Sequence, residues 1–315
     1  MIVEKTISIR RLIPIIWKRM ALMAIISAAI VVPMELLDAK RFAIGMTTPL
    51  ILGTAISIFL GFRTNSAYER WMTGRATFGR LCTQVRNLSL LLARIDGEAY
   101  LHRSDRSVSR RAKPVMDRMI RRGLAFLHVF GRELKGESDP TNFDTVGDLL
   151  GGDELAKLKA HPHPSAQLLY WQSKDFRDAH DEGQFTDGEH FEFVAIQREI
   201  SGIMSECAAL SNTPFPTHYT FFTDVFVWLL VVLLSLSLPG EEANGIYVIP
   251  MVVIIGWTFS MIEGIGDYMD YPWLPNRNAV PVEFLAREME REVRAVAFGE
   301  DHGLPRIEPV EGALY

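Results

Sequence analysis

Four long apolar segments constrain the fold of this chain more than any other feature. They are residues 20–37, 42–62, 219–238 and 246–262. A helix of about 20 mostly apolar residues can cross the hydrocarbon core of a bilayer. The first segment is the weakest, since Pro33 and Glu35 interrupt it, and the turn from Pro239 to Gly245 can join the last two as an antiparallel hairpin. The sequence therefore predicts an integral membrane protein with two helical hairpins.

The N-terminus is basic and then apolar, which is also how a secretory signal peptide begins. No cleavage site leads into a polar mature start, and a second apolar segment follows at once, so we expect a retained first span. Lysines and arginines gather in residues 5–19 and 63–80, whereas the turn at 239–245 holds two glutamates and no base. By the positive-inside rule both termini should be cytosolic, and Lys40 and Arg41 in the first turn do not reverse the count.

The region between the hairpins is too polar to insert and too long for a loop. Its apolar residues recur at three and four positions near 81–95, 114–127 and 193–204, and Pro114 favours a helix start. No strand-like alternation of useful length is present. We therefore expect an all-α protein in five parts. They are a cytosolic N-terminal arm (1–19), a first transmembrane hairpin (20–62), a helical cytosolic body (63–218), a second transmembrane hairpin (219–262) and a cytosolic C-terminal helix and tail (263–315), with 136–166 and 299–315 as connecting or terminal segments.

The composition excludes several classes of function. A net charge of -5 provides no global cationic field, so nucleic acid is not an expected partner. Cys82 and Cys207 have no CxxC spacing, and we expect both to be buried, reduced thiols. Two histidine pairs lack the three or four fixed donors of a metal site and are interpreted as surface residues. They are His161 with His163 and His180 with His190. No metal, cofactor or catalytic residue is predicted, and no hydrolase motif such as GxSxG is found.

Three motifs resemble the bestrophin family. The run IFLGFRTNSAYERW, Ile58–Trp71, is similar to the place where the second membrane helix of bestrophins continues into the cytosol. TPFPTHY at 213–219 and SMIEGIGDYMDYPWLPNRNAVP at 260–281 resemble the family's entry into the third span and its exit from the fourth. The motifs lie in the expected order, whereas residues 96–170 carry none. The resemblance implies a homopentameric channel whose pore follows the fivefold axis.

A stripe on the second span is the candidate site. Thr54, Ile58 and Phe62 are spaced by four on one helical face, and Ser66 and Glu69 lie near that face past the membrane boundary. In the family, the positions matching the first three form a narrow hydrophobic neck, which can block ions by dewetting. The resemblance then makes Ser66 and Glu69 candidate lining of a vestibule. Many relatives have a larger apolar residue where this chain has threonine, which implies a wider or wetter upper neck. Alternatively, Ile58 and Phe62 pack against a neighbouring helix, as apolar stripes usually do.

Carboxylates near the membrane boundary have two interpretations each. Asp224 lies inside the third span, where a charge is costly and suggests function. A helix N-terminus close by would equally stabilise it. Glu263, Asp267 and Asp270 share one face of the helix that leaves the fourth span, and either attract cations or form a solvated face.

Calcium regulation is not expected from this sequence. In animal bestrophins, the segment after the fourth span carries a run of acids that binds calcium. The corresponding stretch here, PWLPNRNAVP at 272–281, contains no Asp or Glu to supply the oxygen ligands that calcium requires.

The sequence therefore predicts a bestrophin-like channel subunit, with no enzymatic activity, whose partners are further copies of itself, the lipid bilayer and small inorganic ions. The rival is a membrane-anchored enzyme or ligand-binding module with Tyr68, Glu69, Arg70 and Trp71 as pocket lining. A secondary transporter is disfavoured, since the hairpins show no repeat. The sign of the ion stays open, because the family includes chloride and other anion channels whereas Glu69 favours cations. A compact chain without sorting signals suggests a bacterial inner membrane.

Overall fold

The computed structural model describes residues 9–102, 106–137, 139–213, 216–240, 245–274, 276, 278–299 and 304–309. Every element in these ranges is helical and none is a strand, so the predicted all-α class is confirmed. The α-helices are α1 (Ile9–Leu36), α2 (Thr47–His102), α3 (Arg106–Leu134), α4 (Gly152–Lys159), α5 (Pro164–Asp181), α6 (Asp187–Asn212), α7 (Thr217–Ser237), α8 (Gly245–Asp270) and α9 (Val282–Phe298). Short 3-10 helices are η1 (Lys40–Phe42), η2 (Pro140–Val146) and η3 (Leu238–Gly240).

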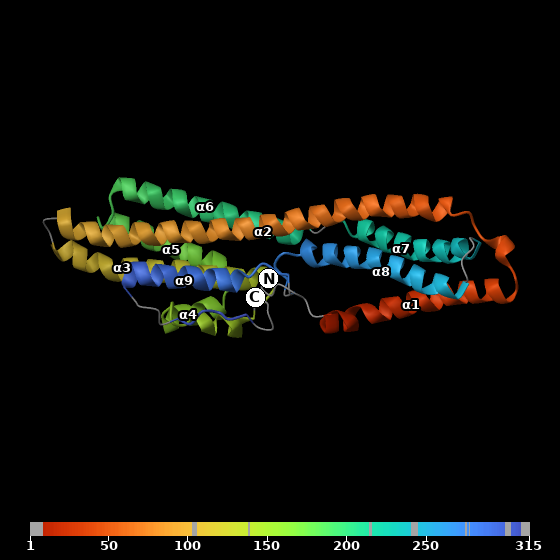
Figure 1. Cartoon of the computed structure of the whole chain (residues 1–315). Helices are drawn as coiled ribbons and strands as arrows, with labels where there is room; N and C mark the ends of the chain where they lie inside the picture. Colours follow the sequence, from red (N-terminus) through yellow and green to blue (C-terminus); the bar gives the residue numbers. More distant parts are fainter. Residues whose placement is uncertain are drawn as a thin grey trace. The chain divides into compact units, whose positions relative to one another are not determined.

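The chain forms two compact units, which are described separately. Residues 4–71 and 214–271 make the hairpin unit, and residues 72–213 and 272–315 make the body unit. The long helix α2 contributes its first part to one unit and its second part to the other (Figure 1). Whether these units correspond to membrane and cytosolic parts stays a prediction.

Within the described ranges, four helices are long and apolar enough to cross a membrane, as the sequence predicts. The candidate spans are Trp17–Leu36, a window within Thr47–Arg94, His218–Ser237 and Tyr247–Asp270. The expected start of the second span at Phe42 is wrong, because Phe42 belongs to η1 and α2 begins at Thr47. Pro49 lies in the first turn of α2, where a missing backbone N–H costs nothing. No proline follows until Pro114, so nothing in the sequence forces α2 to end at the membrane boundary.

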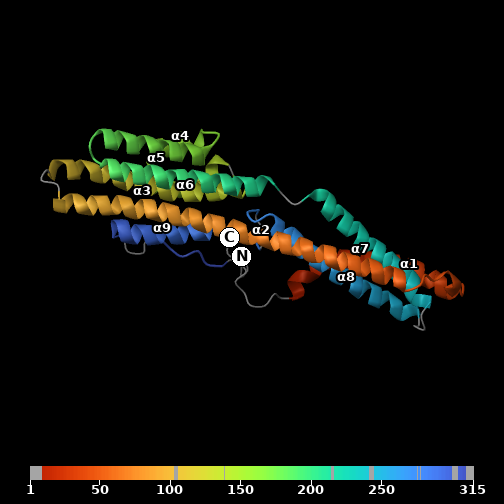
Figure 2. The ribbon, with the colours of Figure 1, turned by 90° about the horizontal axis from the view of Figure 1, so that it is seen from above.

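In the hairpin unit, α1, α7 and α8 pack against one another, and the first part of α2 adds Ile56 and Leu60 to their apolar core. Figure 2 shows these helices running alongside one another. The packing is closest at Gly256 of α8, where a Cβ atom would lie 2.7 Å from a methyl group of Val231 and 3.0 Å from the sulfur of Met23. Only glycine lets the three helices approach this closely.

In the body unit, α3 packs against α5 and α9, and α5 packs against α6. A capping box between Thr186 and Glu189 sets the start of α6. The helices predicted near 81–95, 114–127 and 193–204 are confirmed within α2, α3 and α6. Pro114, however, lies inside α3, which begins at Arg106, so the predicted start is wrong; the loss of one helical hydrogen bond does not stop this helix.

Two further expectations about the body unit can be compared with the structure. The supposed connecting segment 136–166 contains η2 and α4 and is therefore partly helical. Cys82 and Cys207 are free and buried, as the sequence predicts. Burial raises the pKa of the Cys207 thiol to about 12, which keeps it protonated and unreactive at neutral pH.

Candidate functional site

The three predicted neck residues lie on the exposed side of the first part of α2. Ile58 is 55% exposed and Phe62 is 69% exposed, and no described helix of this chain covers them. Thr54 is exposed as well, and its Oγ1 donates to the carbonyl oxygen of Leu50 at 2.8 Å. Because that hydroxyl is satisfied within its own helix, the threonine presents mainly its methyl group.

The other side of this part of α2 is buried. Ile56, Leu60, Arg63 and Ala67 have exposed fractions of 3% or less. With about 100° of rotation per residue, these positions fall on the face nearly opposite Thr54, Ile58 and Phe62. The chain therefore fixes one face of α2 against its own helices and leaves an apolar face that no described part of the chain covers.

The two residues predicted to follow the neck lie further along the same helix. Glu69 is exposed and accepts a hydrogen bond from Asn65 Nδ2 at 2.8 Å, whereas Ser66 is half-buried. The exposed side of α2 thus changes from apolar to acidic within two turns after Phe62.

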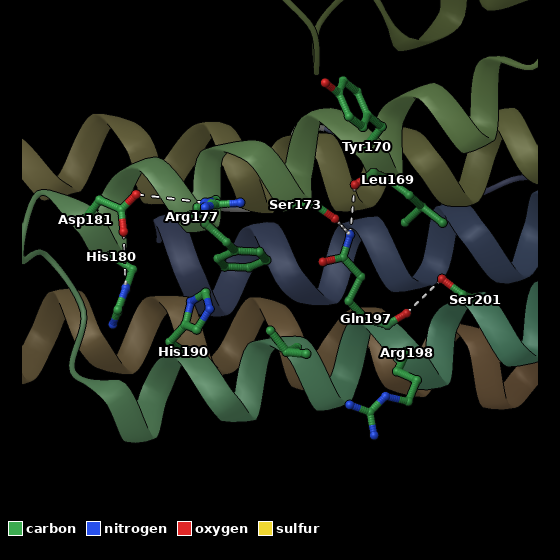
Figure 3. A pocket seen from close by; sticks show the side chains of 12 residues that line it. Leu169, Tyr170, Ser173, Arg177, His180, Asp181, His190, Gln197, Arg198 and Ser201 are labelled. Carbon is green, nitrogen blue, oxygen red and sulfur yellow. Dashed lines mark hydrogen bonds and ion pairs between the residues drawn. The ribbon is translucent and has the colours of Figure 1, made fainter.

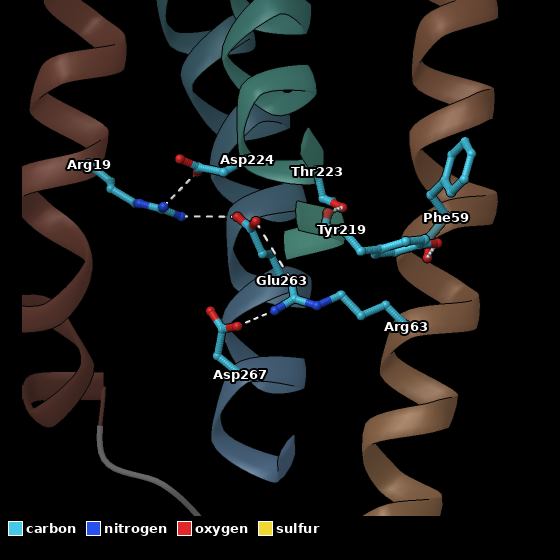
Figure 4. A network of polar contacts seen from close by, with 8 residues as sticks. All are labelled: Arg19, Phe59, Arg63, Tyr219, Thr223, Asp224, Glu263 and Asp267. Atoms are coloured by element: carbon cyan, nitrogen blue, oxygen red, sulfur yellow. Dashed lines mark hydrogen bonds and ion pairs between the residues drawn. The ribbon is translucent and has the colours of Figure 1, made fainter. Parts of the chain in front are cut away.

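A network of charged side chains joins all four helices of the hairpin unit (Figure 4). Glu263 of α8 is 3% exposed and lies between two arginines, with Arg19 Nη1 of α1 at 3.3 Å and Arg63 Nη1 of α2 at 3.7 Å. Arg19 also binds Asp224 of α7 at 2.7 Å, and Arg63 donates to Asp267 of α8. Buried charges are stable only when paired, so these contacts specify how the helices meet.

The interpretation of these acids as a solvated face is wrong for Glu263 and Asp270, which are buried, whereas Asp267 is 54% exposed; the attraction of cations stays a hypothesis. Arg70 Nε of α2 donates to the backbone carbonyl oxygen of Asp270 at 3.0 Å and lies 3.2 Å from Asp270 Oδ1 as an ion pair. Asp224, which is partly exposed near the start of α7, pairs with Arg19 at 2.7 Å, a partner that neither interpretation included; both interpretations stay hypotheses. The sequence offered one signal that was missed: Arg63 and Arg70 are seven residues apart, as are Glu263 and Asp270.

The body unit contains a cavity of about 660 Å3 between α5 and α6 (Figure 3). Two imidazole rings, of His180 and His190, lie 4.4 Å apart at one end. Gln197 donates to Ser173 Oγ at 2.5 Å and to the carbonyl oxygen of Leu169 at 2.8 Å. The cavity has the size of a small-molecule site, but its side chains already bind one another.

His163 is exposed, as expected, whereas the His180–His190 pair and the lining of the rival site differ in part from expectation. His180 and His190 are half-buried and in contact, so they are not independent surface residues. They meet because α5 and α6 form a hairpin around Gly183, whose φ of 70° requires glycine. Tyr68 and Trp71, proposed for the rival site, stack on each other, and neither lines this cavity. Among the described residues, no group of three or more His, Cys, Asp or Glu is placed to hold a metal.

The segment at 272–281 forms a closed loop in its described residues. The backbone N–H of Val280 donates to the carbonyl oxygen of Pro272 at 2.8 Å, and Trp273 and Val280 are buried. Asn278 N donates to Asn276 Oδ1 at 2.8 Å, which closes the turn with an amide side chain. The expectation that calcium does not gate this protein stays a prediction.

Comparisons with known proteins identify relatives over most of the chain. The voltage-dependent anion channel-forming protein YneE of Salmonella typhi is 22% identical over 282 residues, which cover 87% of this chain and 84% of that protein. The voltage-dependent anion channel-forming protein alr2987 of Nostoc is 25% identical over 253 residues, covering 77% and 76%. The crystal structure of a bacterial bestrophin homologue from Klebsiella pneumoniae has a TM-score of 0.77 at 21% identity and covers 90% of this chain and 98% of that chain.

The family model described as Bacterial/Fungal Bestrophin protein matches residues 6–295. The three motifs that suggested this family in the sequence all lie within that range. The fold shared with the Klebsiella homologue agrees with the match. This chain belongs to the bacterial and fungal bestrophin family.

Proposed function

We propose that the chain is a subunit of a homopentameric ion channel in which the exposed face of α2 lines the ion path. The observation that carries the proposal is the opposition of the two faces of α2. Ile58 and Phe62 are exposed, whereas Leu60 and Arg63 are buried against the chain's own helices. Other helices of this unit also expose apolar side chains, such as Ile25, Phe221 and Ile254. We place α2 at an axis shared by several copies because its exposed face continues past the span to Glu69.

The chemistry of this face fits a neck that restricts ions through size and dewetting. A ring of phenylalanine or isoleucine side chains offers ions no replacement for their hydration shell. Thr54 presents a smaller side chain whose hydroxyl is already bonded, so the neck narrows toward Phe62. Glu69, exposed beyond the neck, places negative charge where a vestibule would begin.

The membrane placement completes the proposal. The four candidate spans cross the bilayer, with residues 63–218 and both termini in the cytosol of a bacterium and the bilayer as its inner membrane. The basic side chains of Arg19 and Arg63 then lie near the cytosolic boundary, where their pairing with acids lowers the cost of burial.

The first test is the mass of the detergent-solubilised full-length protein. We expect an assembly of five 35.6-kDa chains, because one chain cannot enclose a pore with a single stripe. A monomer that retains its helical fold would contradict the proposal.

The second test is the sign of the ion, measured as a reversal potential across a salt gradient with reconstituted protein. The relatives are named as anion channel-forming proteins, whereas Glu69 on the exposed face favours cations. Absence of any current in vesicles that contain the assembled protein would reject the channel.

A second candidate function is a membrane-anchored ligand-binding module, which the α5–α6 cavity favours. It predicts a protein that works as a monomer and whose function is lost on filling the cavity, for example with Ser173→Trp. The channel proposal predicts that ion flux depends on α2 instead.

A further inference from the structure

Two anchor points hold α2 beside the exposed stripe. The hydroxyl of Tyr219 in α7 donates to the carbonyl oxygen of Phe59 at 3.1 Å, and the two rings meet edge to face at 5.7 Å. Four residues later, Arg63 binds Glu263 and Asp267 of α8 (Figure 4). Each anchored residue directly follows a stripe residue, since Phe59 follows Ile58 and Arg63 follows Phe62.

This arrangement couples rotation of α2 to the direction of the stripe. Neighbouring residues on a helix differ by about 100°, so holding Phe59 and Arg63 in place fixes where Ile58 and Phe62 point. A turn of α2 about its own axis would break both anchors and carry the stripe away from its present direction.

Arg63 is the stronger of the two anchors because it is a buried charge. Its side chain is 3% exposed, and it lies across Gly266, where a Cβ atom would be 3.8 Å from its Nε. Apolar contacts tolerate sliding, whereas a buried guanidinium loses its partners when the helix turns and then remains uncompensated. Further along α2, Arg70 is bound by Asp270 at 3.2 Å, which holds the same face of α2 against the same helix.

We propose that Arg63 is a positioning residue: its pairing with Glu263 and Asp267 sets the rotation of α2 and thereby directs Ile58 and Phe62 toward the ion path. The inference rests on the proposed channel function and adds to it the element that controls the neck. Arg70 extends the same contact along the helix. Loss of Arg63 should therefore change which side of α2 faces water, even in protein that still assembles.

Cysteine accessibility in the full-length protein, reconstituted in vesicles, tests this directly. Phe62→Cys and Leu60→Cys report the two faces of α2, and the native thiols Cys82 and Cys207 are buried and give little background. With Arg63 intact, a water-soluble maleimide should modify a cysteine at 62 and leave one at 60 unmodified. An unreactive cysteine at 62 in this background would overturn the proposed neck, and with it this inference.

The deciding comparison adds a second substitution to each reporter. With Arg63→Gln, the modification rate at 62 should fall several-fold while the rate at 60 rises. Arg63→Lys keeps the charge and should restore most of the original pattern. The matched control is Arg80→Gln, an exposed arginine of α2 that pairs with Glu199 and Glu206 and should change neither rate.

Should Arg63→Gln prevent assembly, Asp267→Asn removes one partner at the exposed end of the network and leaves Glu263 in place. Like Arg63→Gln, it should lower the modification rate at 62 and raise the rate at 60, but each by a smaller factor. Unchanged rates at 60 and 62 in assembled Arg63→Gln or Asp267→Asn protein would overturn the positioning role while leaving the channel proposal intact.

Discussion

The two parts of α2, residues 47–71 and 72–94, follow the same packing rule but expose different chemistry. The buried residues include Ile56 and Leu60 in the first part and Leu81 and Val85 in the second. The exposed residues include Ile58 and Phe62 in the first part and Arg80, Thr83 and Asn87 in the second. Burial at helical spacing thus identifies the face that packs against the chain, and the polarity of the opposite face indicates whether that face meets an apolar or an aqueous environment. In the second part that opposite face is mostly polar, with Met72 and Leu90 as its exposed apolar residues, whereas in the first part it is mostly apolar, which is why we place the ion path there.

The largest expected effect is the difference in unfolding free energy between large-to-small substitutions on the buried face of α2 and those on its exposed face. Leu60→Ala and Leu81→Ala each remove a fully buried side chain and should cost about 2–5 kcal/mol of unfolding free energy. Ile58→Ala, on the exposed face, should change it by only about 0.5 kcal/mol. Denaturant unfolding in detergent measures all three. A cost for Ile58→Ala equal to that of Leu60→Ala would show that the stripe packs against protein.

Two glycines of α2, one in each part, allow the same comparison of packed and unpacked faces, with smaller expected changes in stability. A Cβ atom at Gly74 would lie 2.9 Å from Cβ of Pro272 and 3.3 Å from a methyl group of Leu210, so Gly74→Ala should cost about 1–3 kcal/mol. A Cβ atom at Gly61 would meet no described side chain or backbone from another turn of the chain within 4 Å, so Gly61→Ala should stabilise the helix by up to about 1 kcal/mol. Thermal unfolding of the assembled protein compares them. A destabilising Gly61→Ala would indicate that another surface contacts this face.

A pH dependence should arise in the body unit, where charges are buried outside the spans. Burial alone would raise the pKa of the Glu290 carboxyl, but the hydrogen bond from His128 at 2.9 Å and the charges of Arg287 and Arg294 lower it below 4.5. A lowered carboxyl pKa stabilises the folded state above the unfolded pKa, and this contribution is lost as pH falls through the folded value.

The variant Glu290→Gln isolates this contribution. At neutral pH it should unfold more readily than the unmodified protein, and the difference should shrink below about pH 4. Unfolding midpoints measured from neutral to acidic pH give the comparison. A difference that stays constant with pH would mean that packing, and not charge, is what Glu290 supplies.

The smallest expected effect is that of calcium. Residues 272–281 contain no carboxylate, and their described turn is closed by Asn276 and by backbone hydrogen bonds. Micromolar calcium should therefore leave the current of the reconstituted protein unchanged. A silent channel that opens on calcium addition would require carboxylate ligands elsewhere in the assembly.

Much of the fold follows from the sequence because the signals are local. Apolar runs mark the four spans, and helical spacing marks the buried faces near residues 81, 120 and 200. Helix ends were less well predicted: hydropathy continues through Phe42, while the backbone of η1 delays α2 until Thr47. Likewise, Pro114 lies inside α3, which begins at Arg106, so the proline does not mark the helix start.

The site was only partly predictable. The exposure of Ile58 and Phe62 agrees with their expected stripe, but their role in a neck remains a proposal. The network around Glu263 could not be read from the sequence, because its arginine partners lie about 200 residues or more away in the chain. The spacing of seven shared by Arg63 with Arg70 and by Glu263 with Asp270 is consistent with parallel pairing, and only the fold shows that it occurs.

The central claim is that the exposed apolar face of α2 forms the neck of an ion path. Ion flux through Phe62→Ala protein in vesicles tests it most directly. Phe221→Ala is the matched control, because Phe221 is a similarly exposed aromatic residue of α7, at 63% against 69% for Phe62. We expect Phe62→Ala to raise the flux with little change in stability, Thr54→Ile to lower it, and Phe221→Ala to leave it unchanged. Unchanged flux in Phe62→Ala, or lost assembly without increased flux, would contradict the assignment of the neck.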